Sequence, residues 1–592
     1  MCGIAGIMTA DGRPPDPATL ERMTGCLAHR GPDGRGRHLA GDVALVQTRL
    51  AIIDLQTGDQ PLFAATPAGG RAALIANAEI YNFVELRAAM ADVAFATRSD
   101  CEPPLHLYLR HGVSFASHLR GMYAIAIHDP DARRLVLARD PFGIKPLYYV
   151  EAAAGFAFAS EPQALIEAGW AKPSLCPAQR DELLQLQFTT GRATVFEGVQ
   201  RVLPGETLVV EAGRVVERRR LDALPRERPR RASVTDALNE LDGVLTDSVG
   251  VHQRADVPYG MFFSGGIDSS VLLAMMVRLN ERPVRTFTAG FPGTAVHDER
   301  RHAREVALAV GADPVDVEFT EADFWRLLPE IAAAMDDPAA DYAVLPTYKL
   351  AQAARADGLK VVLSGEGGDE LFAGYGRYRT ADRTWPFARE MRRTGMLDGL
   401  GVLREEGRRR PWRTGIAAAE RAAVGAGWTR LQTVQAVDCA DWLPHDLLTK
   451  LDRCLMANGV EGRVPFLDPA VARFAFLLPD ALKIRRGQGK WLLRRWLETG
   501  LPASRPFTRK RGFTVPVGEW MRRRGRSLGR LVATQDGVAE ACRMEAVEAL
   551  FQSDKPRHAK AAWTLLFFAL WHRRHILGRP PAGDVLETLA AA

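Results

Sequence analysis

The sequence contains few cysteines and no long apolar run. Its seven Cys are scattered over 592 residues, too sparsely for the disulfide framework of a small secreted domain. The longest strongly apolar stretch, residues 561–571, is much shorter than the roughly 20 residues that cross a bilayer, so we expect a buried helix there. The N-terminus has no charged segment followed by an apolar one. These absences favour a cytoplasmic protein without a membrane partner.

The sequence also lacks a strong excess of charge of one sign. Lys and Arg number 77 against 71 Asp and Glu, which gives a formal net charge of +6. Basic residues cluster only briefly, at 217–231, 408–413 and 522–526, without the interleaved aromatics or zinc-ligand spacing of many nucleic-acid binders. We therefore expect solvated faces and a linker, and no nucleic-acid partner. The length predicts two or more domains.

Short β-type runs dominate the first 215 residues. They cover 3–8, 43–53, 73–80, 123–128, 134–138, 146–150, 155–159 and 207–211. Helical patterns are few, chiefly at 19–28 and 102–111, so the pattern predicts an α+β domain of mainly antiparallel sheet, with the N-terminus inside a strand. An Arg- and Pro-rich segment without apolar periodicity follows, and we place the interdomain linker at 216–234.

Strands and helices alternate beyond residue 235. Strands are predicted at 257–263, 284–291, 314–319 and 359–363, and helices at 270–280, 299–310 and 344–356. Such alternation predicts an α/β domain with a parallel sheet between helices, where ligands bind beyond the carboxyl ends of the strands. From about residue 415 the chain is predicted to be mainly helical.

The N-terminus carries a candidate nucleophile. Met1 precedes a small residue and is expected to be removed, which leaves Cys2 with a thiol and a free α-amine. An α-amine titrates near about 8 and a thiol near about 8.5, so this residue could supply its own general base. Alone, a Cys at the second position is as readily an accident of sequence.

Five further motifs follow Cys2 in order. The set is CGIAG at 2–6, HRGPD at 29–33, RLAIID at 49–54, NAEIYN at 77–82, SD at 99–100 and RDPFGIKPLYY at 139–149. Together they resemble the glutaminase domain of the class II glutamine amidotransferases, which are N-terminal nucleophile hydrolases with a four-layer αββα sandwich. The resemblance implies that Cys2 attacks the side-chain amide of glutamine, forms a thioester and releases ammonia.

The resemblance also assigns the surrounding residues. The Asn77 side chain and the Ala78 backbone N–H would hold the oxyanion; the family usually has Gly at the Ala78 position, which matters only if the turn needs a positive φ. Arg49 would bind the α-carboxylate of glutamine and Asp100 its α-amine, with Glu79 in the same binding set. Without the resemblance, Arg49 is interpreted as a surface charge and Asp100 as a helix N-cap.

A Gly-rich loop, SGGIDSS at 264–270, stands between a predicted strand and a predicted helix. Glycines let the backbone approach a phosphate, and the helix N-terminus adds N–H donors. The loop lacks the G-x-x-x-x-G-K-[ST] pattern, which disfavours γ-phosphate hydrolysis. It resembles the pyrophosphate loop of ATP pyrophosphatases, which implies AMP-forming activation of an acid. The expected ATP-binding residues are Phe263, Ser264, Gly265, Gly266, Asp268, Ser269, Ser270, Ala289, Ser364 and Gly365.

A second motif, LSGEGGDELFAGY at 363–375, ends another predicted strand. Asp268 and Asp369 would face each other across the triphosphate and suit Mg²⁺, although each is also interpretable as a charge at a helix start. Glu366 would assist formation of the acyl adenylate or take a proton from ammonia. The segments 459–468 and 489–494 resemble the closing motifs of asparagine synthetases, with Gly462 where an aliphatic residue is more usual. By that resemblance Lys490 neutralises charge on the phosphates; otherwise it is a solvated side chain.

Nearly the whole chain resembles glutamine-hydrolysing asparagine synthetases of the B type. The resemblance implies a glutaminase domain at 1–215 and a synthetase domain at 235–592. Its substrates would be glutamine, aspartate and ATP, with Mg²⁺ and a β-aspartyl-AMP intermediate. Ammonia would pass between the sites through an internal passage that excludes water, and a homodimer is an assembly that it allows.

Three other interpretations stay open. A sister enzyme could amidate or cyclise a different carboxylate, in a secondary metabolite, a peptide osmolyte or a polysaccharide, because function depends on the site and not on the fold. A variant without glutaminase activity could use free ammonia. An RNA-modifying ATP pyrophosphatase would use the same loop, but it would be expected to carry an RNA-binding module, and the sequence contains no such module.

Overall fold

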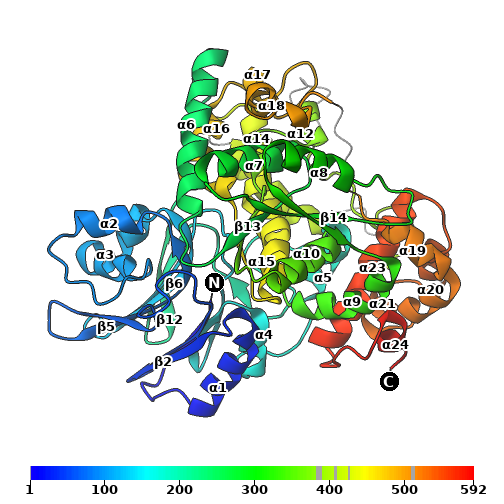
Figure 1. Cartoon of the computed structure of the whole chain (residues 1–592). Helices are drawn as coiled ribbons and strands as arrows, with labels where there is room; N and C mark the ends of the chain where they lie inside the picture. Colours follow the sequence, from blue (N-terminus) through cyan, green and yellow to red (C-terminus); the bar gives the residue numbers. More distant parts are fainter. Residues whose placement is uncertain (1, 382–389, 406–409, 425–426, 509–513, 592) are drawn as a thin grey trace.

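The computed structural model describes residues 2–381, 390–405, 410–424, 427–508 and 514–591. Met1 and part of the basic cluster at 408–413 lie outside these residues. The N-terminal part of the chain occupies the lower left of Figure 1, and the C-terminal part lies above it and to the right. Over the described ranges, no helix is both long and apolar enough to span a membrane.

Two six-stranded antiparallel sheets form the N-terminal part. The first has the order β10–β8–β9–β1–β3–β2, and the second has the order β12–β11–β7–β6–β5–β4. The strands of the first sheet are β1 (Gly3–Thr9), β2 (Gly34–Ala40), β3 (Val43–Arg49), β8 (Tyr148–Ala152), β9 (Gly155–Ala159) and β10 (Gln200–Arg201). Those of the second are β4 (Leu62–Ala65), β5 (Arg71–Ile80), β6 (Gly121–Asp129), β7 (Arg134–Arg139), β11 (Glu206–Glu211) and β12 (Arg214–Arg220).

The two sheets pack face to face around a shared apolar core that includes Ile4, Leu45 and Ile75. Helices α1 (Pro17–Cys26) and α4 (Pro162–Glu167) cover the outer face of the first sheet. Helices α2 (Phe83–Ala89) and α3 (Pro103–His111) cover the outer face of the second. This helix–sheet–sheet–helix order is the predicted αββα sandwich. Central strands are buried on both faces, so they appear in the sequence as continuous apolar runs.

The predicted linker starts too early, because its first residues form part of the edge strand of the second sheet. Residues 216–220 were expected to be its first part, but they belong to β12, which pairs with β11. Strand β12 is largely exposed and carries four Arg, so its polar composition resembled a linker. The connection begins after Arg220 and ends at Ser233, whose side chain caps α6 (Val234–His252) by accepting a hydrogen bond from the Asp236 N–H.

A five-stranded parallel sheet forms the centre of the C-terminal part, in the order β15–β14–β13–β16–β17. Its strands are β13 (Tyr259–Phe262), β14 (Arg285–Gly290), β15 (Asp313–Glu318), β16 (Val361–Leu363) and β17 (Glu461–Arg463). Strand β17 was not predicted. Strands β13, β14 and β15 follow one another toward one edge of the sheet, whereas β16 and β17 lie on the other side of β13. Open α/β sheets bind their ligands where the strand order reverses in this way.

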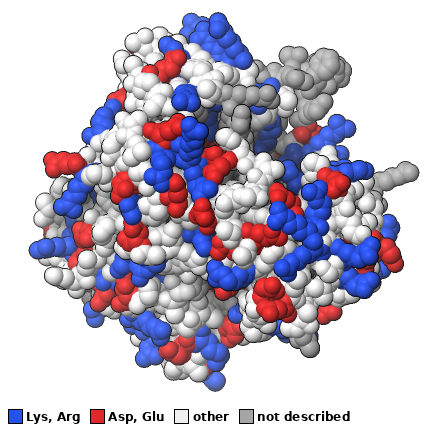
Figure 2. Space-filling model, turned by 45° about the vertical axis from the view of Figure 1, so that its right-hand side comes forward, with Lys and Arg blue, Asp and Glu red and all other residues white. Residues whose placement is uncertain are grey.

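Helices lie on both sides of this sheet. Figure 1 draws α7 (Ile267–Leu279) above β13 and α10 (Val344–Ala356) below it. Beyond the sheet the chain is mainly helical, as expected, and residues 561–571 lie inside α23 (Pro556–His575), where all of them are buried. On the face drawn in Figure 2, positive and negative side chains are interspersed, which agrees with the interpretation of the basic residues as solvated.

Candidate active sites

Cys2 lies where the two antiparallel sheets face each other. Side chains alternate along β1, and Ile4 faces the core between the sheets, so Cys2 faces the same space. Only 7% of Cys2 is exposed. Its backbone N–H donates to the Asn77 Oδ1 atom of the opposite sheet at 3.0 Å. The candidate nucleophile is therefore fixed between a strand of each sheet.

Two N–H donors stand beside this thiol. The Asn77 Nδ2 atom is buried and has no hydrogen-bond partner within the described part of the chain. On β5, the Ala76 N–H donates to Gln60 Oε1 and the Ile80 N–H donates to Asp100 Oδ2. Both N–H groups point away from β6. Alternation directs the Ala78 N–H to the same side. Ala78 has an ordinary strand conformation without a positive φ, so its backbone does not require the usual Gly.

Gln47 is a neighbour of Cys2 that the sequence analysis missed. It is 1% exposed and lies opposite Ile4 in the β1–β3 register. Its Nε2 atom makes no hydrogen bond to any described residue. Burial raises the pKa of Cys2, whereas the Leu50 backbone, Arg49 and the Gln47 side chain lower it. Only the register of β1 against β3 would have revealed this position.

The expected glutamine-binding residues lie around the same space. Arg49 is buried, so the surface interpretation was wrong; its Nη1 atom pairs with Asp59 Oδ1 at 2.7 Å. Asp100 is also buried, and burial raises its pKa to about 6. The N-cap of α3 is Glu102, so Asp100 does not cap that helix. Glu79 pairs with Arg463 at 2.8 Å.

The second site lies at the carboxyl end of β13. The chain turns at Gly265, whose φ is +68°, and α7 starts at Ile267 with Gly266 as its N-cap. The turn opens on a hollow of about 940 Å³. Its lining residues include Ser264, Gly265, Gly266, Ile267, His297, Arg301, His302, Arg494 and Arg505, together with the acidic residues Asp298, Glu299 and Glu305. Backbone N–H groups at a helix start and several cationic side chains suit a polyphosphate.

The other expected nucleotide residues surround this loop. Phe263 donates its N–H to Phe287 O, and Ala289 lies at the end of β14. The Ser264 and Ser269 hydroxyls lie 3.2 Å apart. Ser270 Oγ is buried and has no hydrogen-bond partner among the described residues. These residues therefore lie at the carboxyl ends of β13 and β14 and at the start of α7, which joins the two strands.

Lys490 stands between the two aspartates of this site. Its Nζ atom lies 2.5 Å from Asp369 Oδ1 and forms an ion pair with Asp268 Oδ2. Lys490 is 2% exposed, so the solvated interpretation was wrong. Burial lowers the pKa of Lys490, but the two carboxylates outweigh burial and raise the pKa above its ordinary value. A permanent positive charge is thus held at the mouth of the Gly-rich loop.

Glycines permit the close packing around this ion cluster. A Cβ atom on Gly368 would lie 2.6 Å from Asp268 Cγ, and one on Gly374 would lie 1.8 Å from Asp369 Oδ1. A Cβ atom on Gly489 would lie 2.1 Å from the carbonyl oxygen of Ala373. Gly368 and Gly374 of the second motif and Gly489 before Lys490 are therefore steric requirements of the Asp–Lys–Asp arrangement.

Glu366 and Ser364 follow β16 beside the cluster. Burial raises the pKa of Glu366, and the charges of Asp341, Asp369 and Asp268 add to this effect, whereas Lys450 opposes it. A carboxyl with a raised pKa can exchange a proton near neutral pH. Gly365 approaches Asp268 closely, because a Cβ atom there would lie 3.1 Å from Asp268 Cβ.

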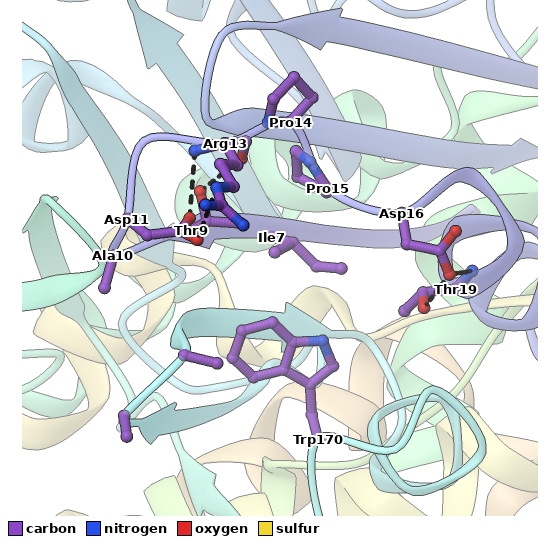
Figure 3. A pocket seen from close by; sticks show the side chains of 12 residues that line it. Ile7, Thr9, Ala10, Asp11, Arg13, Pro14, Pro15, Asp16, Thr19 and Trp170 are labelled. Carbon is purple, nitrogen blue, oxygen red and sulfur yellow. Dashed lines mark hydrogen bonds and ion pairs between the residues drawn. The ribbon is translucent and has the colours of Figure 1, made fainter.

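A separate hollow of about 660 Å³ lies near the start of α1. Figure 3 shows Trp170 facing Ile7 across it, with Pro14 and Pro15 on one side. None of the expected site residues lines this hollow. It is therefore unrelated to either of the two candidate sites.

The geometry defines a class of enzyme, a two-site glutamine amidotransferase with a thiol site and a nucleotide-type loop in one chain. Residues 1–220 match the glutamine amidotransferase domain model, and residues 240–573 match the asparagine synthase model. The chain therefore belongs to the asparagine synthase family.

Three relatives illustrate this similarity. The chain is 34% identical to a putative glutamine-hydrolyzing asparagine synthetase of Mycobacterium tuberculosis, over 97% of each chain. It is 31% identical to glutamine-hydrolyzing asparagine synthetase 1 of Bacillus subtilis, again over 97% of each. It is 28% identical to the amidase chry2 of Gibberella zeae, over 82% of this chain and 84% of that protein.

Proposed function

We propose that the protein makes asparagine from aspartate, with glutamine as the nitrogen donor and ATP as the activating substrate. The observation that carries this proposal is the presence in one chain of a buried Cys2–Asn77 pair and an Asp268–Lys490–Asp369 cluster. The full-length similarity to proteins named asparagine synthetases supports the choice of acid.

Glutamine hydrolysis begins at Cys2. The thiol of Cys2 loses its proton to the α-amine that removal of Met1 exposes, and the sulfur attacks the side-chain amide carbon of glutamine. Asn77 Nδ2 and the Ala78 N–H hold the oxyanion, and the α-amine returns the proton to the departing ammonia. Arg49, Glu79 and Asp100 bind the α-groups of glutamine. Water then cleaves the thioester and releases glutamate, which restores the Cys2 thiol.

Aspartate is activated at the Gly-rich loop. Its β-carboxylate attacks the α-phosphorus of ATP, and pyrophosphate leaves. Lys490 stabilises the negative charge that develops on the phosphates. Asp268 and Asp369 supply the two carboxylates that suit Mg²⁺ shared with a pyrophosphate, and the bound ion would neutralise further phosphate charge. Ammonia then attacks the β-carbonyl carbon, Glu366 takes a proton from it, and AMP leaves.

The same proposal includes the domain boundaries, the cellular compartment and the oligomeric state. The glutaminase domain would extend to Arg220, the end of β12, and the synthetase domain would begin with α6. All seven Cys are free thiols, which supports a reducing compartment such as the cytoplasm. A homodimer remains an expectation from the family resemblance.

A screen of acids tests the proposal. Purified protein is given glutamine, ATP, Mg²⁺ and either aspartate or other amino and hydroxy acids, and pyrophosphate and amide product are measured together. We expect both with aspartate. Cys2→Ala should abolish glutamine-driven but not ammonia-driven synthesis, and Asp268→Asn should lose pyrophosphate release but keep glutamine hydrolysis. Product with another acid and none with aspartate would identify a sister amidotransferase.

A further inference from the structure

Arg463 joins the two halves of the molecule at a buried point. It ends β17, the edge strand of the parallel sheet, and is fully buried. Its guanidinium pairs with Glu79 of the sandwich at 2.8 Å and with Glu461 at 2.6 Å. The Nη1 atom also donates to the carbonyl oxygens of His252 and Arg254, at 2.9 and 2.7 Å. A single side chain is thus held by carboxylates from both halves.

The backbone of Arg463 reaches the other site. Its carbonyl oxygen accepts the Ser364 N–H at 2.8 Å, and β17 pairs with β16 so that Arg463 lies opposite Leu363. Ser364 starts the loop that carries Glu366 and Asp369. One residue therefore contacts an expected glutamine-binding carboxylate through its side chain and the acid-activating loop through its backbone.

The charges around Arg463 make this contact sensitive to glutamine. The carboxyl groups of Glu79, Glu461 and Asp100 lie near one guanidinium. The positive charge of Arg463 acts to lower the pKa of all three. A buried guanidinium is stable only while its acceptors remain in place. The α-ammonium of glutamine would bring a second cation to Glu79 and Asp100. The position of Arg463 and the binding of glutamine must therefore affect each other.

We propose that Arg463 is a positioning residue that couples the glutamine site to the acid-activating loop. This inference rests on the proposed function. Ligands at the synthetase site fix the loop that begins at Ser364, the loop fixes Arg463, and Arg463 orients Glu79 toward the α-ammonium. Thermodynamic linkage makes the effect reciprocal, so glutamine strengthens ligand binding at the loop by the same factor.

Calorimetry on a Cys2→Ala parent tests the coupling, because this protein should bind glutamine without consuming it. Glutamine is titrated with and without aspartate plus α,β-methylene ATP, which cannot be cleaved between the α- and β-phosphates. We expect these ligands to lower the Kd for glutamine by about fivefold or more. In the same background, Arg463→Lys keeps the charge but loses the planar fork, and the ratio of the two Kd values should fall to about one.

Arg201→Lys is the matched control. Arg201 is also a buried arginine that crosses between the halves, with Nη2 at 2.6 Å and Nε at 2.9 Å from the Asp337 carboxylate oxygens. It contacts none of the expected site residues, so this variant should retain the coupling ratio of the parent. If the ratio of the two glutamine Kd values falls to about one in both variants, the interface between the halves is loosened in general. That result would overturn the specific role of Arg463.

Other outcomes also decide the inference. A parent ratio of about one, or an unchanged ratio in Arg463→Lys, overturns the coupling. A parent that binds no glutamine refutes the proposed function instead. If Arg463→Lys does not fold, hydrogen exchange in the parent gives the answer: glutamine should slow exchange of the Ser364 N–H, and unchanged exchange overturns the proposal.

Discussion

Both the oxygen and the nitrogen of the Asn77 side-chain amide have a place in the thiol site. Its Oδ1 atom accepts the Cys2 N–H at 3.0 Å, and its Nδ2 atom is buried and has no partner among the described residues. The Nδ2 donor is held in place by the bond that Oδ1 makes, so it is oriented before an oxyanion forms and favours the transition state.

Removal of this donor should therefore slow glutamine hydrolysis selectively. We expect Asn77→Ala to lower kcat by about 10²- to 10³-fold, measured as glutamate release. Ammonia-driven pyrophosphate release should stay normal. Asn77→Asp keeps an acceptor for the Cys2 N–H but lacks the donor, so it should lose as much. Full activity in Asn77→Asp would contradict the oxyanion role.

The ionisation of Asp100 should control glutamine binding. Burial raises its pKa to about 6, and only the charged carboxylate can pair with the α-ammonium of glutamine. The KM for glutamine should rise roughly tenfold per pH unit below this value, measured between pH 5 and 8. Because the folded chain holds this proton more tightly than the unfolded chain, the contribution of Asp100 to stability falls as pH rises from about 4 to 6.

Asp100→Asn provides the comparison for this pH profile. The amide cannot ionise, so this variant should have a high KM for glutamine that no longer depends on Asp100 protonation. A wild-type KM that is constant across the range, or a variant profile that still follows pH in the same way, would assign the dependence to another group.

At the scale of elements, the sequence predicted the central strands and the edge strand β15, but it missed the edge strands β2, β4, β10, β12 and β17. Strands such as β5 and β6 are buried on both faces and appear as apolar runs. Strands β2 and β12 are largely exposed, so their alternating polar residues resembled loops or a linker. An edge strand gains its hydrogen bonds from one neighbour only, and its side chains need not be apolar.

The motifs indicated the segments of the two candidate sites but not all of the residues that support them. Contiguous segments carry Cys2, Asp268 and Lys490, and their residue types identify them. Gln47 and Arg463 act through neighbours on other strands or in the other half of the molecule. Gln47 lies in none of the motifs, and although Arg463 lies in the motif at 459–468, its contact with the other half depends on packing that the motif does not reveal.

The second site should tolerate a methyl group at Gly376 but not at Gly374, which belongs to the motif at 363–375. A Cβ atom on Gly374 would lie 1.8 Å from Asp369 Oδ1 and 2.2 Å from Lys490 Cε, whereas one on Gly376 meets only the end of the Arg379 side chain at 3.3 Å. We expect Gly374→Ala to reduce pyrophosphate release by at least about tenfold, while glutamine hydrolysis continues. Gly376→Ala should resemble the wild type, and equal losses would argue against the steric explanation.

At the scale of the molecule, buried ion pairs connect the two halves. Arg30 binds the Asp452 carboxylate through two bonds of 2.8 and 2.9 Å, and Arg201 binds Asp337 in the same way. Arg30 also donates to the Cys2 carbonyl at 3.3 Å. The synthetase half therefore helps to position the nucleophile of the glutaminase half.

Loss of one such carboxylate should destabilise the whole protein. Asp452→Asn removes one of the two carboxylates that pair with the fully buried Arg30 and leaves Glu161 as the other, a change that costs about 1.5–3 kcal/mol. Urea denaturation should measure this loss, with little dependence on salt because the pair is shielded from solvent. Asp222→Asn breaks the exposed pair with Arg226 and should leave the transition unchanged. Similar midpoints for Asp452→Asn and the wild type would contradict the prediction.

The ion pairs Arg30–Asp452 and Arg201–Asp337 connect the two halves, and they limit which chimeric enzymes can fold. A foreign glutaminase half grafted onto this synthetase half would present its own side chains to Asp337 and Asp452. Loss of Arg201 would leave the buried Asp337 carboxylate without this cationic partner, and loss of Arg30 would leave Asp452 with Arg453 of its own half. Grafts between relatives should therefore succeed only when both ends of every pair are transplanted together, and in natural descent the two partners should change in step.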